Sequence, residues 1–435
     1  MDLPTNKLDT RVQKPTIYIE ECPTLEIHEG YVSEKEENVL VKQGKKIIAK
    51  VHLSKPVMVV QAEQEEKWGF FQFPVIGKAS DGTLIVSWHM REDSHKAYGK
   101  AGRKYTPMMS KDGGKTWRPQ DKIYFAPVRG YNGLMKDGRL LQVITPASKN
   151  IKEYSFFPKP VAAWGGRSFY IVDELPQDLQ GTYLQFVGES FKSQTIHATL
   201  RDSSLVRNAI GELMPVVWWG NIIQMADNSM VAGVYPARYV NEKSGVTRSS
   251  VSFYRSTDDG LSWDIIGRIS CEADGILDKR GDNEFDEPTF EVLPDSTFIC
   301  AMRSGSTSPM YKTFSYDKGY SWTKPEPFTP NGVNPKLMRL GNNVLVLASG
   351  RPGVQLRFSL DGDGKTWTEP IEMLPFSYSS FNKDMAFEAT CGYANIIADG
   401  ENSFYIVYSD FKTKNTKGEQ RKAIMVRRVE VVKTK

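Results

Sequence analysis

Charged side chains stand at the ends of predicted strands, where a buried strand would normally carry apolar residues. Glu287 follows Asp286 at the start of one such strand, whereas Arg303 and Arg351 end two others. A carboxylate in this position can transfer a proton, and a guanidinium group can bind an anion. Turn acids and structural cations are the alternative interpretation, so the strands that carry these residues must be considered next.

A turn motif occurs four times and indicates how those strands are arranged. This Asp box has the pattern S-x-D-x-G-x-[ST]-W and stands at Ser110–Trp117, Ser256–Trp263, Ser315–Trp322 and, with one extra residue, Ser359–Trp367. Its Asp can accept hydrogen bonds from nearby backbone amides, its Gly can adopt a positive φ, and its Trp can fold back as an apolar plug. Four copies predict a repeat fold of strands and tight turns.

Hairpins that recur around the boxes predict the architecture. Each is a polar turn leading into a short apolar strand, and the turns begin at Asp81, Asp137, Asp227, Asp295, Asn342 and Asp399. The last three boxes are spaced by about one propeller blade. We therefore expect an all-β fold, a six-bladed β-propeller with Asp-box (BNR) repeats. A seventh, degenerate blade in the long gap between the first two boxes is the alternative.

That gap must hold a blade without a box, around 130–188, and an insertion near 189–214. Within the insertion, Ser204–Leu213 is predicted as a short helix. Residues 45–435 are predicted as one propeller domain, in which a strand from 45–60 joins the last blade and closes the ring. Residues 1–44 show no repeat and are predicted as an N-terminal segment with no assigned role.

Composition excludes several functions. Lys and Arg number 56 against 52 for Asp and Glu, and a net charge of +4 does not favour nucleic-acid binding. No stretch approaches the ~20 apolar residues of a membrane span. Residues 1–10 lack the apolar segment of a signal peptide. This sequence is compatible with a cytoplasmic protein and also with a secreted or periplasmic protein whose leader was removed. The cysteines and histidines lack metal-ligand spacing, and no metal or cofactor is predicted.

Three segments resemble the sialidase (neuraminidase) superfamily, in particular bacterial exo-alpha-sialidases. The stretch from Asp286 to Ser304 is similar to the family segment that carries a glutamate and one arginine of the carboxylate-binding triad, at Glu287 and Arg303. Ser-Gly-Arg351 resembles the strand of another triad arginine. Cys-Gly-Tyr393-Ala resembles the motif of the nucleophilic tyrosine.

The resemblance implies roles for these residues. Sialidases are exceptional glycosidases because their nucleophile is a tyrosine, which the substrate carboxylate does not repel. Tyrosine has a reference pKa of about 10 and needs a base, so Glu287 would take the proton of Tyr393. Arg303 and Arg351 would hold the sugar carboxylate. Asp93 would protonate the leaving oxygen, with Glu92 and His95 competing for that role in the same loop.

One position departs from the family. Phe70–Pro74 lies where sialidases have Tyr-Arg-Ile-Pro, and Gln72 stands in place of the first triad arginine. Glutamine can hydrogen-bond but lacks the cationic fork of arginine. Arg91, nearby in sequence, is a candidate replacement. Plain packing of Gln72 and an ordinary core position for Tyr393 are the alternatives.

Three functions therefore stay open. The resemblance implies an exo-acting glycoside hydrolase that cleaves a terminal sialic acid or related acidic sugar from a glycan or glycoconjugate. Gln72 favours instead a propeller that binds glycan or protein without catalysis. A hydrolase or lyase for another acidic sugar, such as a uronate, is the third, since propellers host many functions.

Overall fold

Strands make up most of the part of the chain that the computed structural model describes. That part comprises residues 35–79, 81–94, 97, 102–120, 132–144, 148–188, 193–214, 218–241, 245–271, 284–305, 308–351, 353–374 and 389–434. Its helices are three short 3-10 turns, η3 (Ile151–Glu153), η4 (Val172–Glu174) and η5 (Gln177–Leu179). None of the described helices has the length and apolarity to cross a membrane. The all-β prediction is confirmed.

Four-stranded antiparallel meanders recur along the chain, and three of them form separate sheets. The first contains β4 (Phe70–Lys78), β5 (Leu84–Met90), β6 (Met108–Ser110) and β7 (Arg118–Pro119). The second contains β22 (Asp286–Val292), β23 (Phe298–Arg303), β24 (Met310–Ser315) and β25 (Glu326–Thr329). The third contains β26 (Val333–Arg339), β27 (Leu345–Gly350), β28 (Val354–Ser359) and β29 (Ile371–Glu372).

Two further meanders belong to one larger sheet. They are β8 (Gly133–Leu134), β9 (Leu140–Ile144), β13 (Thr182–Val187) and β14 (Ser193–Arg201), and β17 (Trp218–Gln224), β18 (Met230–Asn241), β20 (Ser250–Ser256) and β21 (Ser262–Ile269). Parallel pairing of β14 with β21 joins them, and β19 (Gly245–Val246) pairs with β18.

The last sheet combines the two ends of the described chain. It contains β30 (Ala394–Ala398), β31 (Ser403–Lys414), β32 (Gln420–Lys433), β1 (Glu37–Gln43), β2 (Lys46–Leu53) and β3 (Val57–Gln61). Strands β2 and β3 both pair with β32, and β1 pairs with β2. The start of the chain thus covers the edge that β32 would otherwise expose. Residues 1–34 of the predicted N-terminal segment lie outside the described residues.

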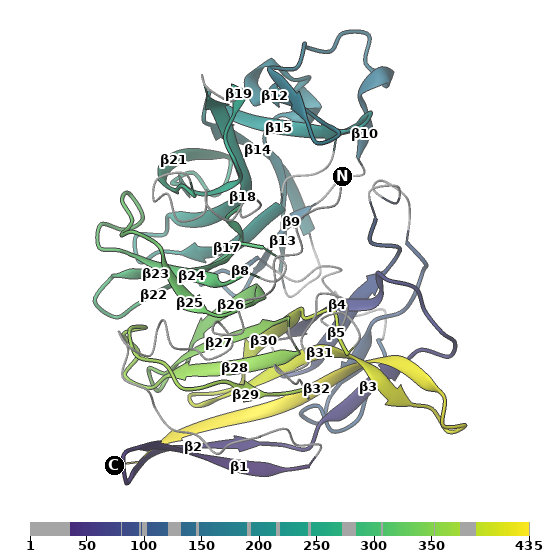
Figure 1. Ribbon diagram of the computed structural model, residues 1–435, viewed down its shortest axis with the longest axis vertical. Coiled ribbons are helices and arrows are strands. Elements are labelled where there is room, and N and C mark those ends of the chain that lie inside the picture. Colours follow the sequence, from purple (N-terminus) through teal and green to yellow (C-terminus); the bar gives the residue numbers. More distant parts are fainter. Residues whose placement is uncertain are drawn as a thin grey trace, which may run out of the picture.

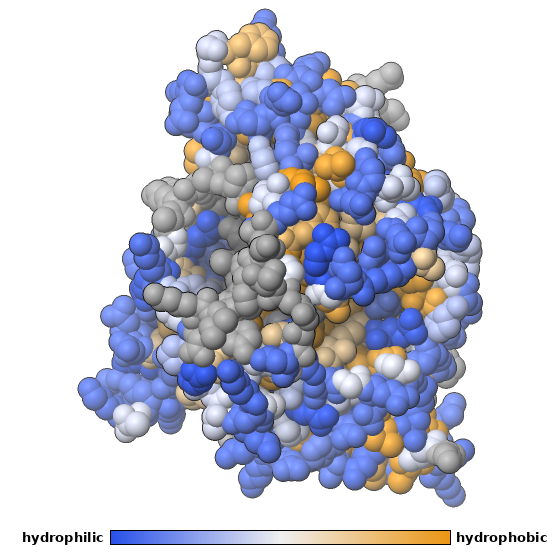
Figure 2. Space-filling model, turned by 180° about the vertical axis from the view of Figure 1, so that it is seen from behind, coloured by the Kyte–Doolittle hydropathy of each residue, from blue (hydrophilic) through white to orange (hydrophobic). Residues whose placement is uncertain are grey.

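Neighbouring meanders touch through their first strands. Contacts join β4 to β30, β30 to β26, β26 to β22, β22 to β17 and β17 to β8. In Figure 1 the colours pass from β4 and β5 at the right, over the top, down the left side and back to β31 and β32. On the opposite face, hydrophilic residues cover most of the periphery (Figure 2). In the described chain no sheet closes on itself by hydrogen bonds, so the number of blades stays a prediction.

The Asp boxes have the predicted geometry. In the second box, Asp258 accepts hydrogen bonds from the hydroxyl of Ser256 and from the backbone of Ser262, each at 2.9 Å. The indole of Trp263 is fully buried and donates to the Gly260 carbonyl at 3.0 Å, and Gly260 has a φ of 84°. The glycine and tryptophan of the other three boxes repeat this bond.

Each box joins the third strand of a meander to the fourth. Because consecutive strands are antiparallel, the start of a first strand and the end of a second strand lie at the same end of the sheet. The end of the third strand lies at the opposite end. The boxes therefore stand at the end of the sheets opposite to Glu287, Arg303 and Arg351.

The predicted helix at Ser204–Leu213 is wrong. These residues form β15 (Leu205–Ile210) and β16 (Leu213–Met214), joined at Gly211, which has a φ of 59°. Strand β15 pairs with β12 (Arg167–Ile171) and β18, and this pairing outweighs any local helical preference. The insertion therefore contains two stretches of the chain. Strands β15 and β16 form one, and the earlier strands β10 (Lys149–Asn150), β11 (Ala162–Trp164) and β12 form the other.

The buried tryptophan of the second box should contribute strongly to stability. Trp263→Ala removes a fully buried side chain and its bond to Gly260, so we expect the free energy of unfolding to fall by about 3–5 kcal/mol in urea denaturation. Trp117→Ala, at the partly exposed tryptophan of the first box, is the matched control and should lose less. Equal losses would contradict a stabilising role that depends on burial.

Candidate active site

Bulges near the start of three first strands turn one side chain each toward a common cavity. The strands β4, β22 and β26 lose register with their neighbours at this point. Inside the bulges Phe73, Glu287 and Asn334 have positive φ values of 49°, 50° and 47°, and each precedes a proline. A bulge redirects a side chain that would otherwise alternate with its neighbours, and all three side chains line the cavity.

A tyrosine, a glutamate and an arginine meet beside this cavity. The hydroxyl of Tyr393, just ahead of β30, donates to Oε1 of Glu287. Arg303 Nη1 donates to the same carboxylate oxygen at 2.8 Å and to the Tyr393 oxygen at 3.0 Å. The second carboxylate oxygen accepts from the backbone N–H of Asn334 at 2.7 Å. The β22–β23 hairpin, in which Asp286 opposes Arg303, brings the acid and the arginine together.

Arg351 lies against the same tyrosine. Its guanidinium carbon is 5.6 Å from the centre of the Tyr393 ring, and its Nε donates to the carbonyl of Cys391 at 3.3 Å. Two glycines permit this approach, because a Cβ at Gly350 would lie 1.9 Å from the Gly392 oxygen. A Cβ at Gly392 would in turn lie 2.7 Å from Arg351. The glycine of the Cys-Gly-Tyr motif thus has a packing role.

Electrostatics favour an ionised glutamate and a neutral phenol. Burial raises the pKa of Glu287, but Arg303 and the hydrogen bonds from Tyr393 and Asn334 outweigh it, and the net shift is downward. Burial and the negative charge of Glu287 raise the pKa of Tyr393, against the opposing effect of Arg303 and Arg351. The phenol therefore holds its proton and shares it with a carboxylate, which is the arrangement of a nucleophile beside its base.

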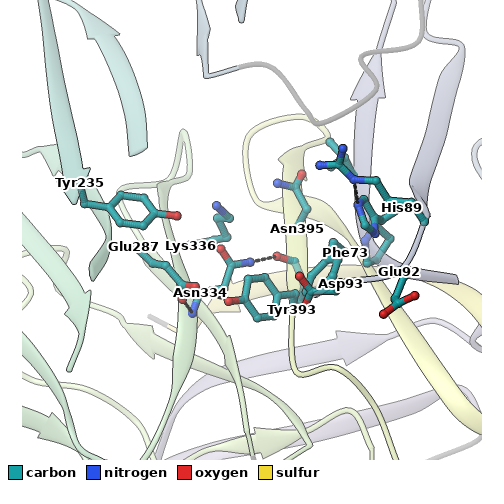
Figure 3. A pocket seen from close by; sticks show the side chains of 14 residues that line it. Phe73, His89, Glu92, Asp93, Tyr235, Glu287, Asn334, Lys336, Tyr393 and Asn395 are labelled. Atoms are coloured by element: carbon teal, nitrogen blue, oxygen red, sulfur yellow. Dashed lines mark hydrogen bonds between the residues drawn. The ribbon is translucent and has the colours of Figure 1, made fainter. Parts of the chain in front are cut away.

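The cavity has a volume of about 390 Å³, and the loop after β5 forms part of its wall. Asp93 lines it and accepts a hydrogen bond from the indole of Trp68 at 3.0 Å. Arg91 and Glu92 also line it. His95 lies outside the described residues. Figure 3 shows Asp93 and Glu92 on one side of Tyr393, with Tyr235 on the other.

Gln72 lies away from the cavity wall. Its side chain is fully buried, and neither its amide nitrogen nor its amide oxygen has a hydrogen-bond partner among the described residues. Arg303 and Arg351 are likewise absent from the described lining, although both contact Tyr393. The structure thus brings together Tyr393, Glu287, Arg303 and Arg351 and puts Asp93 and Arg91 in the adjoining cavity.

Several lining residues were missed by the sequence analysis. They are Asn334, Lys336, Tyr235 and Asn395. One signal could have found Asn334, because it stands eight residues before the turn residue Asn342, as Glu287 stands before Asp295 and Phe73 before Asp81. The other three have no comparable pattern. In the described chain no group of three or more His, Cys, Asp or Glu is placed to hold a metal.

A family model matches half of the chain. The BNR repeat-like domain covers residues 188–406. The chain belongs to this family. No curated protein matches the sequence. The Asp-box resemblance identified from the sequence is confirmed by the match and by the structures that share the fold.

Solved structures of other proteins are similar to this chain. A protein of unknown function from Dyadobacter fermentans is 19% identical, with 86% of this chain and 99% of that chain covered and a TM-score of 0.56. A Hadza microbial sialidase is 15% identical, with 92% and 74% covered and a TM-score of 0.50. An alpha-L-arabinanase from Penicillium chrysogenum is 13% identical, with 86% and 98% covered and a TM-score of 0.48. A sialidase is therefore among the solved structures that share its fold.

The buried amide of Gln72 should destabilise the protein. Because neither amide atom has a described partner, Gln72→Met should raise the free energy of unfolding by about 1 kcal/mol in urea denaturation. Gln142→Met is the matched control, since Gln142 is also buried but donates to the Gln185 side chain. Gln142→Met should lower the free energy of unfolding. If Gln72→Met lowered it more than Gln142→Met does, the conclusion that the Gln72 amide lacks a partner among the described residues would be contradicted.

Asp286 should make stability depend on pH. Burial raises its pKa to about 6, against a hydrogen bond from Ser249 and with support from the charges of Glu284 and Glu287. A carboxyl group whose pKa rises on folding stabilises the protein fully below its unfolded pKa of about 3.9, and this contribution is lost as the pH rises through 6.

Asp286→Asn keeps an acceptor for Ser249 and removes the titration. Relative to wild type, the variant should therefore gain up to about 2 kcal/mol in free energy of unfolding between about pH 4 and about pH 7. Urea denaturation at a series of pH values measures this difference. A difference that stays constant over that range would contradict the raised pKa.

Proposed function

We propose that the protein is an exo-acting glycoside hydrolase of the sialidase type, which removes a terminal sialic acid or related acidic sugar from a glycan or glycoconjugate. One observation carries the proposal: the Tyr393 hydroxyl is bonded to Glu287, and Arg303 donates to both. A tyrosine used only for packing needs a single partner. A phenol shared by a base and a cation at the edge of a cavity suits nucleophilic attack.

The geometry supports a double displacement. The oxygen of Tyr393 forms a bond to the anomeric carbon while its proton passes to Glu287. The glycosidic bond breaks, and Asp93 gives its proton to the leaving oxygen. Water then attacks the anomeric carbon with Asp93 as base, and the Tyr393 oxygen leaves and regains its proton from Glu287. Arg303, 3.0 Å from the Tyr393 oxygen, stabilises charge on that atom in both steps.

The scaffold we propose is a six-bladed propeller formed by residues 45–435. The recurring meanders and the contacts between successive first strands support six blades. The pairing of β2 and β3 with β32 supports closure of the ring by the start of the chain. Strand β1, ahead of the predicted boundary, extends the same sheet.

A propeller that binds sugars without catalysis is the second candidate. It is favoured by the burial of Gln72 and by the position of Arg303 and Arg351 outside the described cavity lining. A hydrolase or lyase for another acidic sugar, such as a uronate, would also use the Tyr393–Glu287 pair. A hydrolase, a lyase and a binding protein differ in whether they release a product and in what that product is, so assays with defined substrates distinguish them.

Activity should depend on the tyrosine oxygen. We expect wild type to release the fluorophore from a fluorogenic sialoside or from another acidic glycoside of a panel. Tyr393→Phe should reduce kcat by at least about a thousandfold, because the nucleophilic oxygen is removed. Urea denaturation of the variant controls for folding. Undiminished turnover by Tyr393→Phe would contradict the proposed nucleophile.

The same panel distinguishes the alternatives. No turnover of any acidic glycoside by wild type, together with binding on a glycan array, would favour the non-catalytic propeller. Sialidase activity gained by Gln72→Arg would then indicate a diverged enzyme site. A product with an unsaturated ring, which absorbs in the near ultraviolet, would indicate a lyase.

A further inference from the structure

Two cations line the cavity in the described chain, and they differ in what already binds them. Arg91 donates from Nε to Nε2 of His89 at 2.8 Å, and Nδ1 of His89 faces the Gly69 carbonyl at 2.7 Å. A guanidinium cannot accept and a carbonyl cannot donate, so the imidazole is neutral with its proton on Nδ1. Arg91 is therefore tied to the wall through a fixed histidine.

Lys336 is the other cation. It lies in β26, two residues after Asn334, and its ammonium group forms no ion pair or hydrogen bond with the residues that the structure describes. Figure 3 shows its side chain on the open side of Tyr393, with Tyr235 and Asn395 also directed there. A partly buried ammonium group with no protein partner can bind a ligand anion.

The arginines predicted as a carboxylate clamp are engaged elsewhere. Arg303 donates to Glu287, to Tyr393 and, from Nε, to the Gly305 carbonyl at 3.1 Å. Arg351 is 6% exposed and packs on the Tyr393 ring. Neither side chain is part of the described cavity lining. A sugar in the cavity would therefore meet Lys336 on the side of the reaction centre.

The position of Lys336 relative to Glu287, the proposed base, supports contact between Lys336 and a bound sugar. Lys336 lines the same cavity as Glu287 and Tyr393, and it lies two residues after Asn334, whose backbone N–H donates to Glu287. In a sialic acid the carboxylate is attached to the anomeric carbon. Glu92 also lines the cavity, and its carboxylate would repel the carboxylate of a bound sugar unless a cation offset it.

We propose that Lys336 is the residue that selects an acidic sugar, by pairing its ammonium group with the carboxylate of the substrate. The inference rests on the proposed function, because its ligand is the sugar of that substrate. It assigns the recognition of the anion to a lysine of β26 rather than to Gln72 or Arg91.

The test compares one ligand with and without its charge. Binding of an unsaturated sialic-acid analogue and of its methyl ester is measured by calorimetry for wild type, Lys336→Met, Lys336→Arg and Arg339→Met. Arg339 is the matched control, since it is an exposed cation three residues further along the same strand, at its last position. Loss of a charged hydrogen bond predicts that Lys336→Met weakens binding of the free acid about ten- to a hundredfold. Binding of the ester should be unchanged.

The affinity for the free acid should depend on a positive charge at position 336 and not on the shape of the side chain. Lys336→Arg should restore most of the affinity for the acid, and Arg339→Met should bind like wild type. The inference is overturned if Lys336→Met binds the acid as wild type does, if it loses acid and ester equally, or if wild type binds no acid. If binding of the acid depends on Lys336 but no substrate is turned over, the role of Lys336 stands and the hydrolase function is rejected. If turnover depends on Tyr393 but not on Lys336, the hydrolase function stands and the role of Lys336 is rejected.

Discussion

Burial of the Glu287 carboxylate is the constraint on which the site depends. An ionised carboxylate away from water is costly unless it is paired and hydrogen-bonded. Here its two oxygens accept from the Tyr393 hydroxyl, the Arg303 guanidinium and the Asn334 backbone. These donors come from three consecutive sheets. The sheets must therefore pack with their first strands in contact, and an error in their placement would leave a buried charge unpaired.

The rest of the fold supplies that placement. Gly350 and Gly392 let two neighbouring sheets approach until their backbones nearly touch, which brings Arg351 onto Tyr393. At the opposite end the Asp boxes close the third and fourth strands with bonds internal to each turn. The boxes thus stabilise the turns at the end away from the site, and the bulged strand ends direct polar side chains into the cavity.

Sequence reasoning succeeded where a feature is local. The boxes are single turns, and Glu287 and Arg303 belong to one hairpin whose pairing follows from the strand pattern. Tyr393 was proposed from a family motif and not from physical reasoning, and the structure places it beside Glu287. Ser204–Leu213 was misassigned because its partner strand, β12, comes from an earlier stretch of the chain that the sequence analysis had not joined to it. Lys336 and Tyr235 reach the cavity only through contacts between sheets, which no spacing in the sequence encodes.

The charges around the tyrosine bear on why position 72 is a glutamine and not an arginine. Glu287 carries one negative charge, Arg303 and Arg351 act on the Tyr393 phenol, and Lys336 lines the adjoining cavity. Among these four charged residues, the cations outnumber the single carboxylate. A further guanidinium at the fully buried position of Gln72 would have to lose its hydration with no described acceptor beside it. A neutral glutamine avoids that cost.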